Sequence, residues 1–142
     1  MPSDWLRIMT DERFSFFSSA KRVMNGPPVF LHPSDTLQVV AEVISREGVG
    51  AAIVRGPLGP EGIVTERDIV EALAQGAKPD DVWAVDIASL DLVTVEPSAT
   101  VRDVIRKMAQ YGIRHVPVKA DGEILRYGFR SRHFWRGSKV RC

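Results

Sequence analysis

The chain has 142 residues, of which 44% are hydrophobic and 26% are charged, a folded-domain composition that is too apolar for a disordered segment. Its 19 Lys and Arg against 18 Asp and Glu leave a formal charge of +1, which argues against a generally basic nucleic-acid-binding protein. The one cysteine is the last residue, Cys142, which excludes an internal disulfide and a metal cluster built on cysteines. The length allows one domain or two small repeats that share a core.

The first 20 residues predict a helical extension outside the rest of the fold. Charged residues interrupt the apolar ones, unlike in a signal peptide, and nowhere does the chain contain a run of 18 apolar residues for a membrane span. We therefore expect a cytoplasmic protein without membrane contact. The extension has enough apolar side chains to dock on the core or on another subunit, namely Trp5, Leu6, Ile8, Met9, Phe14, Phe16 and Phe17.

An internal repeat follows, because residues 29–48 align without a gap with residues 93–112. In both copies the apolar positions recur at i, i+3, i+4 and i+7, the stripe of an amphipathic helix. Six positions are identical: Val29/Val93, Pro33/Pro97, Ser34/Ser98, Thr36/Thr100, Val40/Val104 and Gly48/Gly112.

Each copy predicts the element order β-α-β-β-α. The first copy has strands at 29–31, 51–54 and 62–64, a helix capped by Ser34 and ended by Gly48, and a second helix from Thr65 to about Gln75. The second copy has strands at 93–95 and 115–118, with a helix capped by Ser98 and ended by Gly112. Two such units bury their sheets by packing about a pseudo-twofold axis. The expected boundaries are an extension at 1–20, repeats at 21–76 and 85–136, a linker at 77–84 and a tail at 137–142.

The end of the chain concentrates basic charge. Residues 126–142 contain six Lys and Arg and no acid, whereas residues 1–125 carry 13 Lys and Arg against 18 Asp and Glu, a net −5. Three interpretations of this basic end stay open. It is a solvated end, it pairs with the acidic body or a dimer partner, or it contacts the phosphates of a nucleotide or nucleic acid.

The repeated motifs resemble the CBS domain, and the tandem resembles a stand-alone CBS pair, or Bateman module. The motifs are Pro33-Ser-Asp-Thr-Leu37 and Gly62-Ile-Val-Thr-Glu-Arg-Asp-Ile69 in the first copy, and Pro97-Ser-Ala-Thr-Val101 and Gly112-Ile-Arg-His-Val-Pro-Val118 in the second. The resemblance implies an α/β (α+β) fold and a regulatory, ligand-sensing module rather than an enzyme. It also implies an adenosine ligand between the repeats, with AMP expected and ADP, ATP or S-adenosylmethionine as alternatives, and a homodimer acting on an unknown regulated protein.

The same resemblance assigns Thr65 and Asp68 to the ligand. In the family's Gly-apolar-apolar-Thr-x-x-Asp motif, the Asp holds the ribose hydroxyls and the Thr contacts ribose or phosphate. A carboxylate suits a vicinal diol, because each of its oxygens accepts hydrogen bonds. The alternative for Thr-x-x-Asp at a helix start is a capping box, and the two roles can partly coexist.

Other residues complete the expected site. Arg67, Arg114 and His115 are phosphate candidates, with solvent-exposed charge as the alternative interpretation. A flat apolar slot with backbone edges for the adenine is expected from Val29, Phe30, Leu31, Ala51, Ala52 and Ile53.

The second copy departs from the motif. Aligning Gly128–Phe134 with Gly62–Asp68 needs two inserted residues, and it places Ser131 at the Thr position and Phe134 at the Asp position. One good nucleotide site per chain is therefore expected. The three histidines lack ligand spacing and no catalytic arrangement stands out, so neither a metal nor a catalytic residue is expected. A nucleic-acid-binding accessory protein that uses the basic end, or a ligand-free dimerisation scaffold, are the alternative functions.

Overall fold

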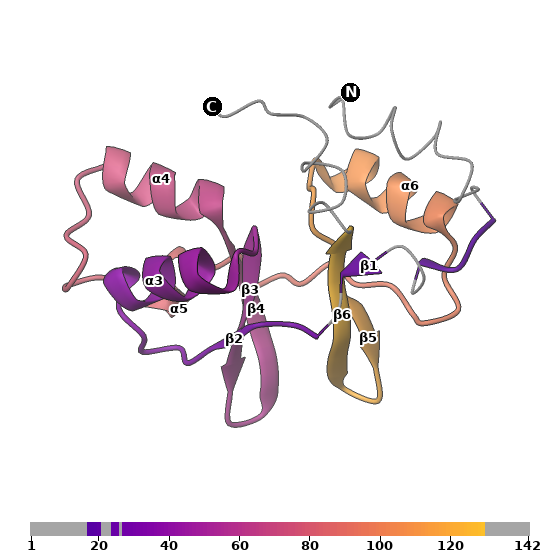
Figure 1. The fold of residues 1–142 in the computed structure, drawn as a ribbon, viewed down its shortest axis with the longest axis horizontal. Helices are drawn as coiled ribbons and strands as arrows, with labels where there is room; N and C mark the ends of the chain where they lie inside the picture. Colours follow the sequence, from indigo (N-terminus) through magenta and orange to yellow (C-terminus); the bar gives the residue numbers. More distant parts are fainter. Residues whose placement is uncertain (1–16, 21–23, 26, 130–142) are drawn as a thin grey trace. The chain divides into compact units, whose positions relative to one another are not determined.

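The computed structural model describes residues 17–20, 24–25 and 27–129, and the chain divides by its contacts into two units (Figure 1). The α4 unit, named after the helix Glu66–Ala74, comprises Pro28–Leu92 and Asp121–Ile124. The α6 unit, named after the helix Val101–Tyr111, comprises Met1–Pro27, Val93–Ala120 and Leu125–Cys142. Each unit is described by itself.

The α4 unit confirms the order expected of the first repeat. Its strands form one sheet in the order β2-β3-β4, in which β2 runs parallel to β3 and β3 antiparallel to β4. Helices α3 and α4 pack on this sheet and contact each other. The elements are β2 (Phe30–Leu31), α3 (Leu37–Glu47), β3 (Ala51–Gly56), β4 (Gly59–Thr65), α4 (Glu66–Ala74) and α5 (Ala84–Ile87).

The core of the α4 unit lies between the sheet and its helices. Alternation along a strand sends neighbouring side chains to opposite faces, so Ala52 and Val54 join the helix-side core while Ala51 and Ile53 lie on the other face. The buried residues of this core are Leu31, Leu37, Val40, Ile44, Ala52, Val54, Val64, Ile69 and Ala84.

The α6 unit has a second, three-stranded sheet in the order β1-β6-β5, formed by Met24–Asn25, Glu123–Phe129 and Val118–Ala120. The strand expected at 93–95 is reduced to one parallel bridge between Val95 and Val118. Pro117 explains the short pairing, because it lacks an amide hydrogen to donate. Its carbonyl oxygen only accepts, from Val95 N at 3.0 Å. The core consists of Ala20, Val95, Val101, Val104, Met108, Val116 and Val118.

The helix ends confirm one expectation and correct another. Gly48 and Gly112 end α3 and α6 in the left-handed conformation, at φ 62° and 65°. The expected N-caps Ser34 and Ser98 are wrong, since Thr36 and Thr100 cap these helices and accept from the amides of residues 39 and 103. Ser34 instead bonds to the His32 ring in the turn before α3, with Oγ 2.7 Å from Nδ1.

The segment expected as a linker is bonded to the first repeat. Val82 O accepts from Leu37 N at 2.7 Å, and Pro79 O accepts from Gln38 N at 3.1 Å. The helix α5 follows directly, and its buried Ala84 belongs to the core of the α4 unit. The repeat boundaries stay a prediction, and the tail at 137–142, the last helix of the second repeat and most of the extension at 1–20 lie outside the described residues.

Candidate functional site

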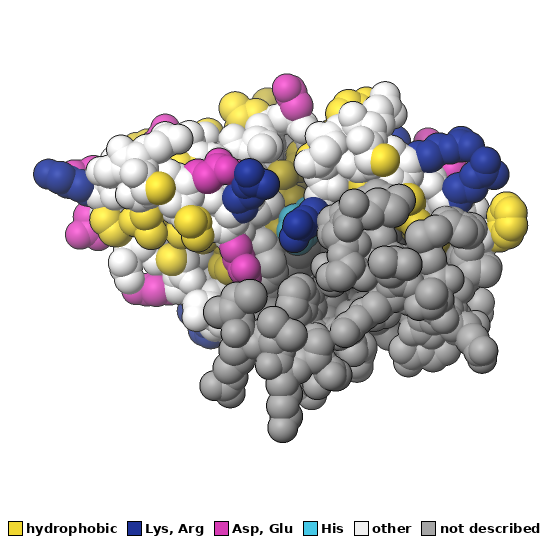
Figure 2. All heavy atoms as spheres, turned by 90° about the horizontal axis from the view of Figure 1, so that it is seen from above, with side chains coloured by type: hydrophobic (Ala, Val, Ile, Leu, Met, Phe, Trp, Pro, Cys, Tyr) yellow, Lys and Arg dark blue, Asp and Glu magenta, His cyan; other side chains and the backbone are white. Residues whose placement is uncertain are grey.

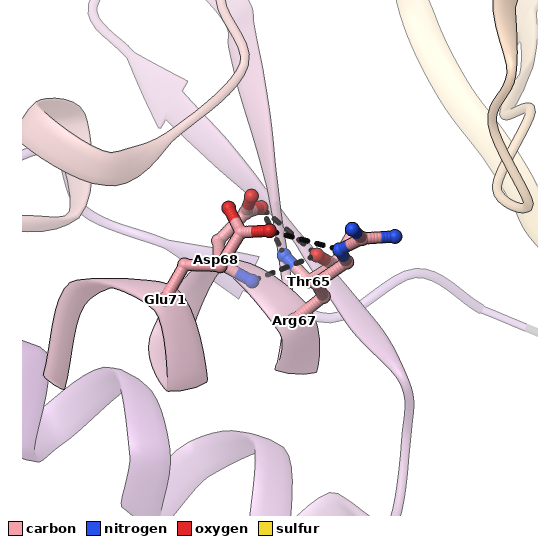
Figure 3. A network of polar contacts seen from close by, with 4 residues as sticks. All are labelled: Thr65, Arg67, Asp68 and Glu71. Carbon is pink, nitrogen blue, oxygen red and sulfur yellow. Dashed lines mark hydrogen bonds and ion pairs between the residues drawn. The ribbon is translucent and has the colours of Figure 1, made fainter. Parts of the chain in front are cut away.

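Thr65 and Asp68 meet where strand β4 passes into helix α4 (Figure 3). Thr65 is the N-cap, with an extended backbone at φ −110° and ψ 164°. Asp68 Oδ2 accepts from Thr65 N at 2.8 Å and from Thr65 Oγ1 at 3.0 Å, while Asp68 N donates to Thr65 Oγ1 at 3.2 Å. The two residues therefore form a capping box, which confirms the capping interpretation of the Thr-x-x-Asp motif.

The capping box leaves one carboxylate oxygen available. Both bonds from Thr65 end on Oδ2 of Asp68, and no described residue donates to Oδ1. Asp68 is half-buried at the helix start, so Oδ1 can accept from hydroxyls of an external molecule. Capping and ligand binding use different oxygens of one carboxylate and are compatible.

Two of the first backbone amides of α4 already donate hydrogen bonds within the chain. A helix start exposes amides that lack intrahelical partners and favour an anion. Here Glu66 N donates to Gly50 O at 3.0 Å, and Asp68 N is taken by the Thr65 hydroxyl. The helix start thus offers a phosphate fewer amides than an uncapped helix does.

Arg67 pairs with Glu71 on the next turn of the helix (Figure 3). Its Nε lies 2.9 Å from Glu71 Oε1, an i,i+4 ion pair between largely exposed side chains. Such a pair adds little stability and leaves the guanidinium accessible to solvent. Contact of Arg67 with a phosphate stays a prediction.

Strand pairing brings the expected adenine slot to Thr65. Ala51 lies opposite Thr65 in the β3–β4 ladder, and Phe30 pairs with Ile53 across β2 and β3. The side chains of Leu31, Ala51, Ala52 and Ile53 are buried, with Leu31 and Ala52 in the helix-side core. Recognition of a base by these strands would fall on backbone edges and on the more exposed Val29 and Phe30, and it stays a prediction.

Arg55 is a residue beside this slot that sequence reasoning missed. Its guanidinium carbon lies 5.2 Å from the centre of the Phe30 ring, and its Nη2 lies 2.6 Å from Glu123 Oε1. An arginine that directly follows the buried run 51–54 was the available signal. The contact holds a cation over an aromatic ring that was expected to face the base.

The remaining expected ligand residues belong to other parts of the chain than the α4 unit. Arg114 and His115 belong to the α6 unit, and Ser131 lies outside the described residues, so their roles stay predictions. Among the described residues, no three His, Cys, Asp or Glu side chains gather closely enough to hold a metal ion. No helix in that part of the chain is long and apolar enough to cross a membrane.

A second capping box lies in the α6 unit and was also missed. Asp103 Oδ2 accepts from Thr100 N at 2.9 Å, and Asp103 N donates to Thr100 Oγ1 at 3.2 Å. These bonds, with the positive charge of Arg106 and Arg102, lower the pKa of Asp103 below its ordinary value of 3.8. The Thr-x-x-Asp spacing was the available signal, and the strand that precedes Thr65 has no counterpart here.

The chain matches a known protein family over most of its length. The family model of the CBS domain matches residues 20–75 and again residues 84–126, which together are more than half of the chain. The chain belongs to the CBS domain family. Its two matched stretches make it a tandem, and the first stretch contains Thr65 and Asp68.

This CBS domain protein has both uncharacterised and ligand-bound relatives. An uncharacterised protein of Methanopyrus kandleri is 35% identical over 91 residues, which are 63% of this chain and 46%, about half, of that protein. A solved CBS domain protein from Pyrobaculum aerophilum, complexed with AMP, is 32% identical with a TM-score of 0.68, covering 75% of this chain and 82% of its own. A solved CBS domain pair in complex with 5′-methylthioadenosine and S-adenosyl-L-methionine is 25% identical with a TM-score of 0.71, covering 82% of this chain and 99% of its own.

Proposed function

We propose that this CBS domain protein is a regulatory module that binds an adenosine nucleotide at Thr65 and Asp68 and is not an enzyme. The observation that carries the proposal is the Asp68 carboxylate, whose Oδ1 accepts no hydrogen bond within the described chain while Oδ2 is held by Thr65. Its place in the matched family stretch, and the similarity to an AMP-bound structure, support an adenosine ligand.

Asp68 has the central role in the proposed site. Its Oδ1 accepts from the ribose hydroxyls, while the bonds to Thr65 hold the carboxylate in one orientation. The base lies along strand β2, at the edge of the sheet β2-β3-β4, beside Val29 and Phe30. Arg67, Arg114 and His115 are the proposed phosphate contacts, and Ser131 is assigned to a second, degenerate site that lacks the carboxylate.

AMP is the proposed ligand, with ADP, ATP and S-adenosylmethionine as competitors. All four carry the ribose diol that Asp68 would hold, so this contact selects the adenosine class and not the member. Discrimination within the class depends on how the substituent at the 5′ position is received. We further propose a cytoplasmic homodimer that passes the bound state to a regulated protein.

Isothermal titration calorimetry with AMP, ADP, ATP and S-adenosylmethionine tests the proposal. We expect micromolar or tighter binding of at least one of them to the full chain, and loss of that binding in Asp68→Ala. Absence of heat from all four would overturn the proposal and favour a ligand-free scaffold. Retention of nucleic acid that is lost on removal of residues 126–142 would favour the accessory protein instead.

A further inference from the structure

Arg55 differs from the other arginines of the α4 unit. This unit holds 13 Asp and Glu against 4 Lys and Arg, and Asp and Glu side chains are spread over the described surface at the left of Figure 2. Arg46 and Arg67 pair with glutamates one and four residues further along their own helices, at 3.5 Å and 2.9 Å. Arg55 instead reaches Glu123 of the same unit, 68 residues away, at 2.6 Å. The position of its guanidinium is therefore set by tertiary structure and not by one helix.

The Phe30 side chain is an exposed aromatic ring on the edge strand of the sheet. Phe30 is 39% exposed, and β2 pairs with β3 alone in the order β2-β3-β4. It lies opposite Ile53, while Ala51, two residues before Ile53 on β3, lies opposite Thr65. Side chains two residues apart on a strand share a face of the sheet, as do those of opposite residues on neighbouring strands. The Phe30 ring and the Thr65 side chain therefore lie on one face.

The spacing along this face suits a nucleoside. Ala51 and Ile53 are two residues apart on β3, which corresponds to about 6.6 Å along a strand. A nucleoside places its base and its ribose hydroxyls a similar distance apart. A ribose bound at Asp68, which is hydrogen-bonded to Thr65, would therefore place its base at the level of Phe30.

We propose that Arg55 is a positioning residue for the base of the bound nucleotide. It acts through Phe30, because its guanidinium carbon, 5.2 Å from the ring centre, attracts one face of the ring and holds the side chain in one orientation. The base stacks against the ring held in this way. Glu123 holds the guanidinium in turn, with Nη2 and Oε1 2.6 Å apart. The proposal rests on the nucleotide site proposed above and adds a residue that does not touch the ligand.

Preorganisation gives the contact its effect on affinity. A side chain that becomes ordered only on binding costs conformational entropy, whereas a ring held beforehand has already lost that freedom. Arginine suits this role better than lysine, because its planar guanidinium stacks on a ring and still donates to a carboxylate. The side chains of Arg55 and Glu123 are 42% and 46% exposed, so their ion pair by itself adds little stability. The main effect of Arg55 is therefore expected on ligand binding rather than on unfolding.

Calorimetric titration of AMP into full-length variants tests the role of Arg55. Arg55→Leu is expected to weaken AMP binding about fivefold, and Arg55→Lys to weaken it less, because lysine keeps a cation beside the ring. Arg46→Leu is the matched control, since it removes the same charge from the α4 unit at an exposed helix position. It should leave the affinity for AMP unchanged. Circular dichroism checks that each variant is folded.

A double-mutant cycle separates positioning from charge. In the Phe30→Leu background no ring is left to hold, so adding Arg55→Leu should weaken AMP binding no further. An arginine that attracted the phosphate directly would instead change the affinity by the same factor in both backgrounds.

A second measurement needs no ligand. 4-Fluorophenylalanine placed at position 30 of the full chain reports the surroundings of the ring through its fluorine NMR resonance. Arg55→Leu and Glu123→Ala are expected to shift this resonance, whereas Arg46→Leu is not. In the otherwise wild-type chain, addition of AMP is expected to shift it as well.

The outcomes distinguish the positioning role from the nucleotide site itself. Equal AMP affinity of the wild type and Arg55→Leu would overturn the role of Arg55, and so would equal losses with and without the Phe30 ring. A fluorine resonance that neither Arg55→Leu nor Glu123→Ala shifts would overturn the hold on the ring. Absence of binding of all four adenosine ligands would overturn the proposed function, and the positioning role with it, whatever the fluorine resonance shows.

Discussion

At the scale of single residues, two aspartates do the same local work in different surroundings. Asp68 and Asp103 each hold an N-cap threonine through Oδ2. Thr65 ends a seven-residue strand and lies opposite Ala51, whereas Thr100 follows a turn. The capping box is therefore a local property of Thr-x-x-Asp, whereas the ligand site that we propose also depends on the strand that leads into Thr65.

The lowered pKa of Asp103 predicts a pH dependence of stability. A group whose pKa is lower in the folded state stabilises the fold above its ordinary value of 3.8 and loses that contribution as the pH falls through the lowered value. Urea unfolding of the wild type and Asp103→Asn should differ most near neutral pH. The difference should shrink below about pH 3.8. A difference that is constant with pH would contradict the assignment.

At the scale of the elements, a glycine in the left-handed region ends α3 and α6. Both glycines can be located from the sequence, but the expected caps Ser34 and Ser98 lie two residues before the observed ones. A side chain caps a helix when its oxygen accepts from the backbone amide three residues later. Thr36 and Thr100 accept in this way from the amides of residues 39 and 103. Ser34 is taken up by the turn with His32.

Substitutions at Gly112 measure the backbone-conformational contribution of a helix C-cap to stability. A methyl group there would meet no atom within 4 Å, so a substitution acts through the backbone at φ 65° alone. Gly112→Ala should lower the free energy of unfolding by about 1 kcal/mol. Gly112→Asn should cost less, because asparagine tolerates this conformation. Equal stability of the wild type and Gly112→Ala in urea would contradict the cap.

Helix α3 offers a matched pair for the core. Leu37 is 1% exposed in the core of the α4 unit, and Val39, two residues on, is 36% exposed. Leu37→Ala should cost about 2–5 kcal/mol of unfolding free energy, whereas Val39→Ala should stay within about 0.5 kcal/mol. Similar losses in both variants would show that α3 does not pack through the Leu37 face.

At the scale of the whole molecule, the repeat and its element order could be predicted, because they follow local periodicity and a gapless self-alignment. The division into contact units could not, since residues 121–124 join the first repeat through contacts such as the Arg55–Glu123 ion pair, which no local pattern encodes. Arg55 was missed for the same reason, as Glu123 is 68 residues away. The distribution of net charge depends on this division. Residues 1–125 carry a net charge of −5, whereas the α4 unit carries −9 and all other residues together carry +10.

The central claim is that Asp68 binds an adenosine nucleotide and Asp103 does not, although both cap helices. Calorimetric titration of AMP into Asp68→Ala and Asp103→Ala tests it most directly, because each variant loses the same capping-box contact with its N-cap threonine. The account predicts at least about tenfold weaker AMP binding in Asp68→Ala and unchanged affinity in Asp103→Ala. Equal affinity for AMP in the two variants, whether kept or lost, would contradict it.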